Sequence, residues 1–535
     1  MLPNHRIAYV TRFRSSSAGI ALAALLCLAW ARNASAVAFP GCDTPTDADF
    51  NMTTLVSRQA AGLNEPLRMA FDMSDKGDVD IYFVEKAGKV RKYDGVTKSV
   101  TNLGNISVRT TGEHGLLGIA LDPAFKANRR IYLFYGAGQG AYEFRLSRFT
   151  LGASGSLDMG SEKIMLRISA DDQQWHTGGA LQFDVKGDLW VTVGDNKSDE
   201  GGAPNTNSLL GKILRIHPKE DGTYSIPEGN LFAEGTAKTR PEIFIMGDRN
   251  PYSIALDPQT GRVAWGEVGP DGFGPTEEFN ITSKPGNYGW PYFAGNNMAM
   301  KSGKDPKAPV NNGSMNTGLV NLPPAIPATY AYNQSCAITG PVYRYDATPN
   351  SPYKMPPQFE GIWFMTDFNA YGNMGGTMDT MSLDANGTPK KFGRIFPKWK
   401  LASPTDFEVG PDGALYALNY AGYFSTADNT AIVRIEYKGS CRPDSKYSSA
   451  LFHAKDANAN GGGRLEVQGS LVRVRGLGEA DLRVGDFQGR TFLSLHSRGN
   501  AEYDLSRAFQ ERAGLYLVTL VSAGETVSRK AFLGP

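Results

Sequence analysis

A histidine and an aspartate stand at the two ends of a short stretch whose residue types suit acid–base chemistry. His176 lies on a Gly-rich turn, and Asp195 follows the β-branched and aromatic run at 189–193. A Lys-Gly-Asp turn between them predicts a hairpin, which places loop residues from both ends of its strand pair on one rim. The two side chains could therefore meet as a general base and the carboxylate that orients it. The same residues also allow an ordinary hairpin with a capping histidine and a turn aspartate.

The composition indicates a folded, turn-rich protein. The chain has 535 residues, more than one ordinary domain, with 41% hydrophobic residues, 61 glycines and 31 prolines. A net charge of +1 argues against a nucleic-acid partner, whose phosphates must be neutralised by basic side chains.

The N-terminus is typical of a targeting segment. Three arginines precede an apolar run at 18–31, and the small residues at 34–36 suit cleavage. We predict a signal peptide over residues 1–36 and an exported mature protein that is periplasmic, secreted or attached to the cell surface. The apolar run is too short for a stable membrane span, and no later stretch suits a transmembrane anchor.

The cysteines leave two arrangements open. Cys27 lies in the predicted signal peptide, and no two of the remaining three are spaced like a zinc or redox pair. A disulfide between Cys42 and Cys441 would fasten the two ends of the central region and leave Cys336 free. Alternatively, all three are buried thiols.

One phrase, a Gly-containing turn followed by a β-branched or aromatic strand, recurs six times. No convincing amphipathic helix interrupts the strand signals. Irregularly spaced repeats of one hairpin predict radial blades with variable loops, so we expect an all-β fold with a six-bladed β-propeller over residues 37–441. Insertion loops are expected near 293–328. The six copies lie at 77–83, 128–133, 187–191, 261–265, 361–364 and 413–417.

The character of the chain changes after the propeller region. Residues 442–463 are polar and turn-rich, which predicts a linker. Short alternating strands follow, and we predict a small β-sandwich over 464–535 that serves in sorting, attachment or an accessory role. Residues 514–518 and 530–533 resemble type IX secretion sorting tails, which would imply contact with secretion machinery.

Several phrases between residues 60 and 440 follow one another in the order of a known family. Among them are the Trp175-His-Thr-Gly-Gly run, Arg249-Asn-Pro, and Asn287-Tyr-Gly-Trp-Pro. They resemble the soluble pyrroloquinoline quinone (PQQ)-dependent aldose dehydrogenases of the glucose/sorbosone type. The resemblance implies a six-bladed propeller that binds PQQ and calcium and passes electrons to an external acceptor. It also implies oxidation of the anomeric carbon of an aldose or oligosaccharide to a lactone.

The resemblance assigns roles residue by residue. His176 matches the base that takes the proton of the anomeric hydroxyl while hydride passes to the quinone, and Asp195 matches the acidic residue beside it. A histidine with a carboxylate partner can act in this way near neutral pH.

The cofactor contacts are assigned in the same way. Arg249 and Asn250 match the residues that hydrogen-bond the quinone oxygens, and Glu113 stands where a glutamine often lines the pocket. Gly269 and Pro270 match the positions whose carbonyls bind calcium, a hard cation that prefers oxygen ligands.

The sequence departs from the family at the carboxylates of the cofactor. The glucose-oxidising branch meets them with a lysine and two arginines late in the propeller, whereas the matching stretches at 402–406 and 367–373 contain no cation. Lys391, Arg394, Lys398 or Lys400 could substitute from a loop.

The departure motivates a second hypothesis, a non-catalytic carbohydrate-binding propeller at the cell surface. A calcium-dependent lactone hydrolase ranks behind both, because the expected cluster of metal-binding side chains is missing.

Overall fold

The computed structural model describes residues 45–439 and 464–533 apart from short breaks. The breaks lie at 141, 273, 334–335, 347–350, 369–375, 385–386, 397–399, 423–426, 469–470, 476–478, 486–490, 499–500, 506–513 and 523–524. The predicted signal peptide, the linker at 442–463, Cys42 and Cys441 lie outside the described residues.

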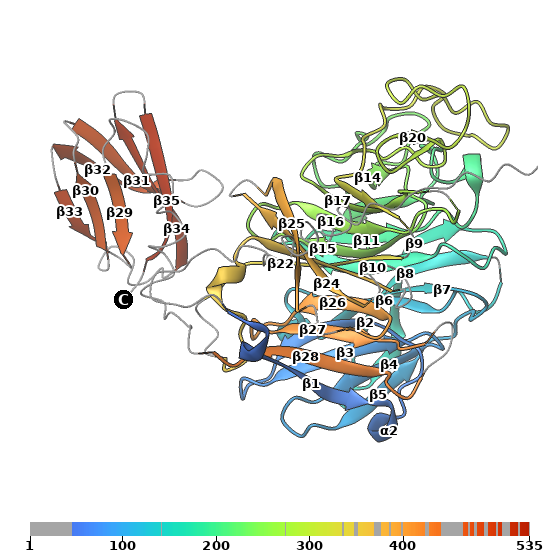
Figure 1. Cartoon of the computed structure of the whole chain (residues 1–535), viewed down its shortest axis with the longest axis horizontal. Coiled ribbons are helices and arrows are strands. Elements are labelled where there is room, and N and C mark those ends of the chain that lie inside the picture. The colour runs from blue at the N-terminus through green and yellow to red at the C-terminus, as the bar shows by residue number, and fades with distance from the viewer. Residues whose placement is uncertain are drawn as a thin grey trace, which may run out of the picture.

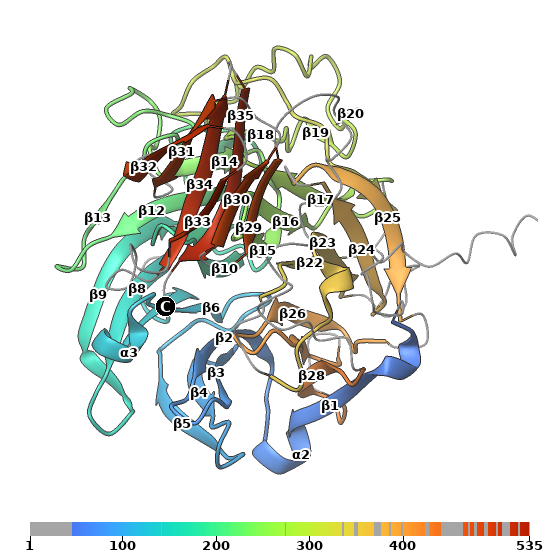
Figure 2. The same cartoon turned by 90° about the vertical axis from the view of Figure 1, so that its left-hand side faces the viewer.

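Six sheets of the described chain surround a common centre, as Figure 2 shows. The first comprises β2 (Pro66–Met73), β3 (Val79–Glu85), β4 (Lys89–Tyr93) and β5 (Val100–Asn105), and the second β6 (Leu116–Leu121), β7 (Arg130–Gly136), β8 (Glu143–Leu151) and β9 (Leu157–Ser169). The third comprises β10 (Gly178–Phe183), β11 (Leu189–Val193), β12 (Lys212–Pro218), β14 (Ile243–Met246) and β18 (Gly286–Asn287), with β13 (Tyr224–Ser225) at its side.

The other three sheets continue around the centre in chain order. The fourth comprises β15 (Pro251–Leu256), β16 (Val263–Glu267), β17 (Glu277–Thr282) and β21 (Tyr330–Tyr332), and the fifth β22 (Ala337–Tyr343), β23 (Ile362–Asp367), β24 (Met378–Leu383) and β25 (Pro389–Ile395). The sixth comprises β26 (Pro404–Val409), β27 (Leu415–Asn419), β28 (Ala431–Tyr437) and β1 (Phe50–Ser57).

The sheets form a closed ring. The first strand of each sheet contacts the first strand of the next, from β2 through β6, β10, β15, β22 and β26 back to β2. The N-terminal strand β1 pairs antiparallel with β28, with Phe50 opposite Tyr437, so both ends of the ring share one sheet. Closure of this kind joins the first and last parts of the repeat region without a free inner edge.

The recurring phrase marks the second strand of every one of these sheets. Its six copies fall on β3, β7, β11, β16, β23 and β27. These strands are mostly apolar and buried because both of their faces are covered by neighbouring sheets. All seven residues of β3, for example, are buried.

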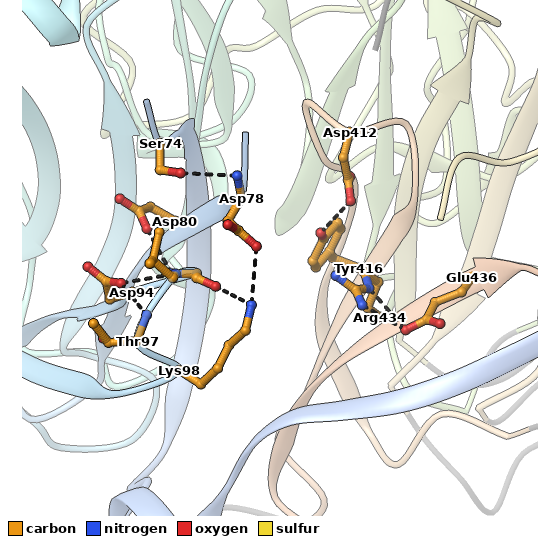
Figure 3. A network of polar contacts seen from close by, with 12 residues as sticks. Ser74, Asp78, Asp80, Asp94, Thr97, Lys98, Asp412, Tyr416, Arg434 and Glu436 are labelled. Carbon is orange, nitrogen blue, oxygen red and sulfur yellow. Dashed lines mark hydrogen bonds and ion pairs between the residues drawn. The ribbon is translucent and has the colours of Figure 1, made fainter. Parts of the chain in front are cut away.

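Side-chain hydrogen bonds also fix turns between neighbouring strands of the first and sixth sheets (Figure 3). Asp80 accepts the N–H of Gly95 at 2.8 Å, which ties the β4–β5 turn to β3. In the neighbouring sixth sheet, the hydroxyl of Tyr416 donates to Asp412 at 3.0 Å. Such bonds satisfy turn groups that the strand ladders leave unpaired.

The remaining elements are short or stand apart from the ring. The helices α2 (Arg58–Ala61) and α3 (Phe125–Asn128) have four residues each, and β19 (Phe293–Ala294) pairs with β20 (Met298–Ala299) in the predicted insertion. The C-terminal residues form a sheet of β29 (Arg464–Gln468), β30 (Leu471–Arg475) and β33 (Ala501–Asp504). A second sheet comprises β32 (Thr491–Arg498), β31 (Glu479–Gly485), β34 (Gly514–Ser522) and β35 (Glu525–Leu533) (Figure 1). Within the described residues, no helix has the length and apolar character to cross a membrane.

Candidate active site

The hairpin expected from the sequence is confirmed, and it joins His176 to Asp195. Strand β10 pairs antiparallel with β11, and Gly178 lies opposite Val193. The Nδ1 atom of His176 lies 2.6 Å from Oδ1 of Asp195, and both residues are buried. Because an ionised carboxylate can only accept, Nδ1 carries the proton and Nε2 keeps its lone pair. Among the described residues, none forms a hydrogen bond with Nε2.

Close backbone approach sets the position of the histidine. His176 adopts a left-handed φ of 63°, and its carbonyl accepts the N–H of Asn196 at 3.2 Å. A Cβ atom on Gly194 would lie 2.0 Å from that carbonyl oxygen, so the glycine before Asp195 lets the two backbones meet. The Val-Gly-Asp pattern is therefore a geometric requirement of this pair.

Asp195 is held on both of its carboxylate oxygens. Oδ1 also accepts the backbone N–H of Lys197 at 2.8 Å, and Oδ2 accepts the indole N–H of Trp290 at 2.7 Å. The carboxylate therefore has three N–H donors, counting His176. Fixed donors of this kind hold an orienting acid in one position.

Glu113 supports the histidine from the other side. Its Oε2 accepts the backbone N–H of His176 at 2.7 Å, that of Thr177 at 3.3 Å, and an amide N–H of Asn250 at 3.4 Å. The adjacent His114 is a packing residue whose Nε2 lies 2.7 Å from the carbonyl of Gln173. Burial lowers the pKa of His114, which keeps its ring neutral.

Arg249 and Asn250 form a rigid pair above the fourth sheet. Both backbone N–H groups donate to Oε1 of Glu267, at 2.6 and 2.8 Å. The guanidinium of Arg249 donates to the carbonyl of Val268 at 2.9 Å, and the amide oxygen of Asn250 accepts the N–H of Gly178 at 3.0 Å. The latter bond joins this pair to the hairpin that carries His176.

One cavity of about 350 Å³ is lined by most of the predicted site residues. Its lining includes Glu113, His176, Arg249, Asn250 and Gly269, whereas Asp195 lies behind the histidine and Pro270 lines a smaller neighbouring chamber. Apolar walls are supplied by the first, second and fifth sheets, through Leu67, Leu117 and Ile338. A concave, partly apolar site with a few converging polar groups is the usual form of a small-molecule site.

Comparison with known proteins identifies the family. The family model described as glucose/sorbosone dehydrogenase matches residues 63–423. The chain belongs to the glucose/sorbosone dehydrogenase family. This match covers the whole cavity described above and every strand of the ring except β1 and β28.

A curated sugar dehydrogenase is similar to part of the chain. The aldose sugar dehydrogenase YliI of Escherichia coli is 30% identical over 235 residues, which are 43% of this chain and 59% of that protein. The chain thus spans little more than half the length of this curated relative.

Solved structures show that the fold is that of these dehydrogenases. A Thermus thermophilus structure titled as a putative oxidoreductase (glucose dehydrogenase) has a TM-score of 0.54 and 25% identity, over 72% of this chain and 99% of that chain. The PQQ-bound aldose sugar dehydrogenase of Streptomyces coelicolor has a TM-score of 0.52 and 21% identity, over 72% and 98% of the two chains.

None of the described loop cations that could substitute for the missing lysine and arginines lines the cavity. Arg394 pairs with Asp379 on the edge of the fifth sheet at 2.7 Å, and neither it nor Lys391 or Lys400 lines the cavity. Lys398 lies outside the described residues. Lys86 and Lys197 line the cavity instead, together with Arg249.

Gly269 and Pro270 line a small chamber of about 10 Å³, and buried acidic side chains line the same chamber. Both carboxylate oxygens of Asp248 and Oε2 of Glu267 have no hydrogen-bond partner among the described residues. Burial and mutual repulsion raise the pKa of both groups well above the usual range, and burial raises that of Glu278 to about 7. These acids line the chamber without converging, since the described chain has no cluster of three or more His, Cys, Asp or Glu side chains suited to a metal.

Lys212 is the buried cation beside these acids. It is fully buried, and its Nζ donates to three backbone carbonyls of the loop before β12. Burial lowers the pKa of Lys212 to about 7, against the opposing attraction of Asp248 and Asp195.

Sequence reasoning overlooked several residues that complete the site. Trp290 stood in the quoted Asn-Tyr-Gly-Trp-Pro phrase and Glu267 in the Gly-Glu-Val-Gly phrase, so both could have been singled out from the resemblance. Lys86 belongs to no recognisable motif, because in the sequence it is an ordinary charged residue in the turn after a strand. Only its place beside the cavity distinguishes it.

Proposed function

We propose that this protein oxidises the anomeric carbon of an aldose or oligosaccharide to a lactone, with PQQ as its bound cofactor. The observation that carries the proposal is the His176–Asp195 pair, whose free Nε2 belongs to a side chain that lines the same cavity as Arg249 and Asn250. Sugar dehydrogenase relatives and a PQQ-bound structure of the same fold support it.

The cavity residues fit a flat, anionic quinone. Arg249 offers a cation and Asn250 an amide at one side, and apolar side chains such as Leu117 and Ile338 can cover an aromatic face. Three cations line the same cavity as two acids, Glu113 and Asp271. When bound, PQQ would supply the hydride acceptor that no amino-acid side chain provides.

His176 would act as the general base. Its Nε2 accepts the proton of the anomeric hydroxyl, and the carboxylate of Asp195 stabilises the imidazolium that forms on the other side of the ring. Trp290 and the N–H of Lys197 prevent that carboxylate from turning away. Glu113 holds the backbone of the histidine, so the ring faces substrate in one orientation.

We also propose calcium as the second cofactor, held near the carbonyls of Gly269 and Pro270. The unpartnered buried oxygens of Asp248 and Glu267 beside these carbonyls fit the charge and oxygen preference of a hard cation. Because the acids do not converge, backbone carbonyls would supply much of the coordination.

Localisation and partners complete the proposal. The N-terminal sequence supports export, and the C-terminal pair of sheets supports an attachment or sorting domain of sandwich form. We infer that the six sheets of the ring are six propeller blades. A sugar and an external electron acceptor would be the small-molecule partners.

The test is turnover of an aldose panel with an artificial electron acceptor, after loading the protein with PQQ and calcium. His176→Asn should abolish measurable turnover while PQQ still binds. The matched control is His217→Asn, because His217 also pairs with an aspartate, Asp188, at 2.8 Å but lies half-exposed on β12 away from the cavity.

One result would reject the enzyme, and another would reject only the role of His176. Wild-type protein without PQQ binding or turnover would contradict it, and glycan binding in such a protein would favour the non-catalytic carbohydrate-binding alternative. Equal turnover in the His176 and His217 variants would remove His176 from the chemistry.

A further inference from the structure

Lys86 stands on the opposite side of the ring from Arg249. Lys86 directly follows β3 in the first sheet, and Arg249 lies two residues before the start of β15 in the fourth. In a closed ring of six sheets, the first and the fourth face each other across the centre. Both side chains line the one cavity at that centre. A ligand held at one end by Arg249 and Asn250 therefore extends toward Lys86.

The backbone of Lys86 is fixed. Its N–H donates to the carbonyl of Glu65 at 2.9 Å, and its carbonyl accepts the N–H of Leu116 at 3.0 Å. A Cβ atom on Gly115 would lie 2.6 Å from both Cγ and the carbonyl oxygen of Lys86, so the second sheet packs directly against this residue. A cation on such a support needs little reorganisation to bind an anion.

The ammonium of Lys86 retains donors for a ligand. Its side chain is 12% exposed, and its ion pair with Glu65 is long, 3.5 Å. The same oxygen of Glu65 accepts the hydroxyl of Tyr420 at 2.6 Å. A lysine ammonium has three N–H donors, so at least two remain for another acceptor. Such a donor favours a carboxylate, with which it forms a charge-assisted hydrogen bond.

The terminal N–H groups of Arg68, on β2 of the first sheet, are engaged by backbone carbonyls. Arg68 donates to the backbone carbonyls of Leu67, Thr405 and Tyr252, and it does not line the cavity. Lys197 lines the cavity but is exposed beside Trp175, on the side of the base. Lys86 is thus the partly buried cation best placed to bind a ligand at the side of the cavity opposite Arg249.

We propose that Lys86 binds a carboxylate of the cofactor at the end opposite its quinone, in place of the late-propeller cations that this sequence lacks. The inference rests on the proposed function, because it takes PQQ as the occupant. The assigned chemistry is a charge-assisted hydrogen bond between an ammonium and a carboxylate. It makes Lys86 a cofactor-binding residue and leaves the proton transfer at His176 unchanged.

The test compares equilibrium binding of PQQ with that of its uncharged trimethyl ester to the full chain with calcium, by calorimetry. Lys86→Gln should weaken PQQ binding about tenfold or more, since a charge-assisted hydrogen bond is lost. The same variant should bind the triester within about twofold of wild type, because no carboxylate remains to be recognised. Lys86→Arg, which keeps the charge, should recover most of the affinity for PQQ.

Lys89→Gln is the matched control. Lys89 lies on β4 near Lys86 and pairs with Glu85 at 3.7 Å, but it is half-exposed and does not line the cavity. The Lys89→Gln variant should bind PQQ with the affinity of the wild type. Melting temperatures of all variants, measured without ligand, show whether any loss of binding reflects misfolding.

The possible outcomes separate the inference from the proposed function. Unchanged PQQ binding by Lys86→Gln, or an equal loss of PQQ and triester, overturns the role of Lys86 and leaves the enzyme intact. Wild-type protein that binds neither compound overturns both. A selective loss for PQQ, restored in Lys86→Arg, supports the proposal.

Discussion

The imidazole Nδ1 of His176 lies 2.6 Å from the carboxylate Oδ1 of Asp195, across the open end of the β10–β11 hairpin. This contact fixes the tautomer of the histidine and leaves Nε2 as the acceptor for a substrate proton. The second oxygen of Asp195 binds Trp290, which lies 95 residues further along the chain. The orientation of the His176 base therefore depends both on the local hairpin and on a segment distant in the sequence.

Asp195→Asn should lower kcat about 100-fold or more, because an amide cannot both accept from His176 and accept from Trp290 through its two ends. The Kd for PQQ should change little. Steady-state kinetics with a sugar that the wild type oxidises, together with PQQ titration, measure both quantities. Asp188→Asn, which disturbs the His217 pair, is the control and should retain wild-type kcat.

Trp290→Phe should lower kcat by a smaller factor, about 5- to 30-fold, because it removes one neutral N–H donor from Asp195 and keeps the ring. Trp190→Phe is the comparison, since its indole also donates to an aspartate, Asp184, at 3.1 Å, outside the site. If both variants lost the same activity, the Trp290 bond would have no special role in orienting the carboxylate.

The kcat of the Glu113→Ala variant should be about tenfold lower than the kcat of the Glu113→Gln variant. The glutamine retains an oxygen that can accept the N–H of His176, whereas alanine leaves this buried donor without a partner. The ratio of the two kcat values, measured at saturating sugar and PQQ, checks the expectation. Equal kcat values would show that the charge of Glu113 matters more than its hydrogen bond.

Lys212 should make the protein more stable as the pH rises above neutrality. Its pKa is about 7 in the folded chain because of burial, against an ordinary value of 10.5. Between these values the folded lysine is neutral and the unfolded lysine is charged, so unfolding takes up a proton and the free energy of unfolding rises with pH. The limiting slope for one group is about 1.4 kcal/mol per pH unit.

Urea unfolding from pH 6 to pH 10 measures this slope. Lys212→Met should be less stable overall, because three carbonyls lose their donor, and should show a smaller rise with pH. Lys219→Met, at an exposed turn, should keep the wild-type slope. A wild-type slope in Lys212→Met would assign the pH dependence to other groups.

The sequence by itself determined the elements that have local signals. The six copies of the turn-and-strand pattern predicted the second strand of each of the six sheets. A turn followed by β-branched and aromatic residues favours the same conformation wherever it occurs. The His176–Asp195 contact was predictable for the same reason, because one hairpin carries both residues. Motif order also placed Arg249 and Asn250 beside them.

Only the tertiary structure decided which distant side chains complete the cavity. Glu113 supports His176 from the second sheet, Trp290 holds Asp195, and Lys86 faces Arg249 from the first sheet. No periodic sequence pattern predicts these contacts, because each one depends on closure of the ring and on the path of the loops between sheets. Ring closure brings the first and fourth sheets to face each other across one cavity. Local conformational propensity does not specify which distant sheets will face each other.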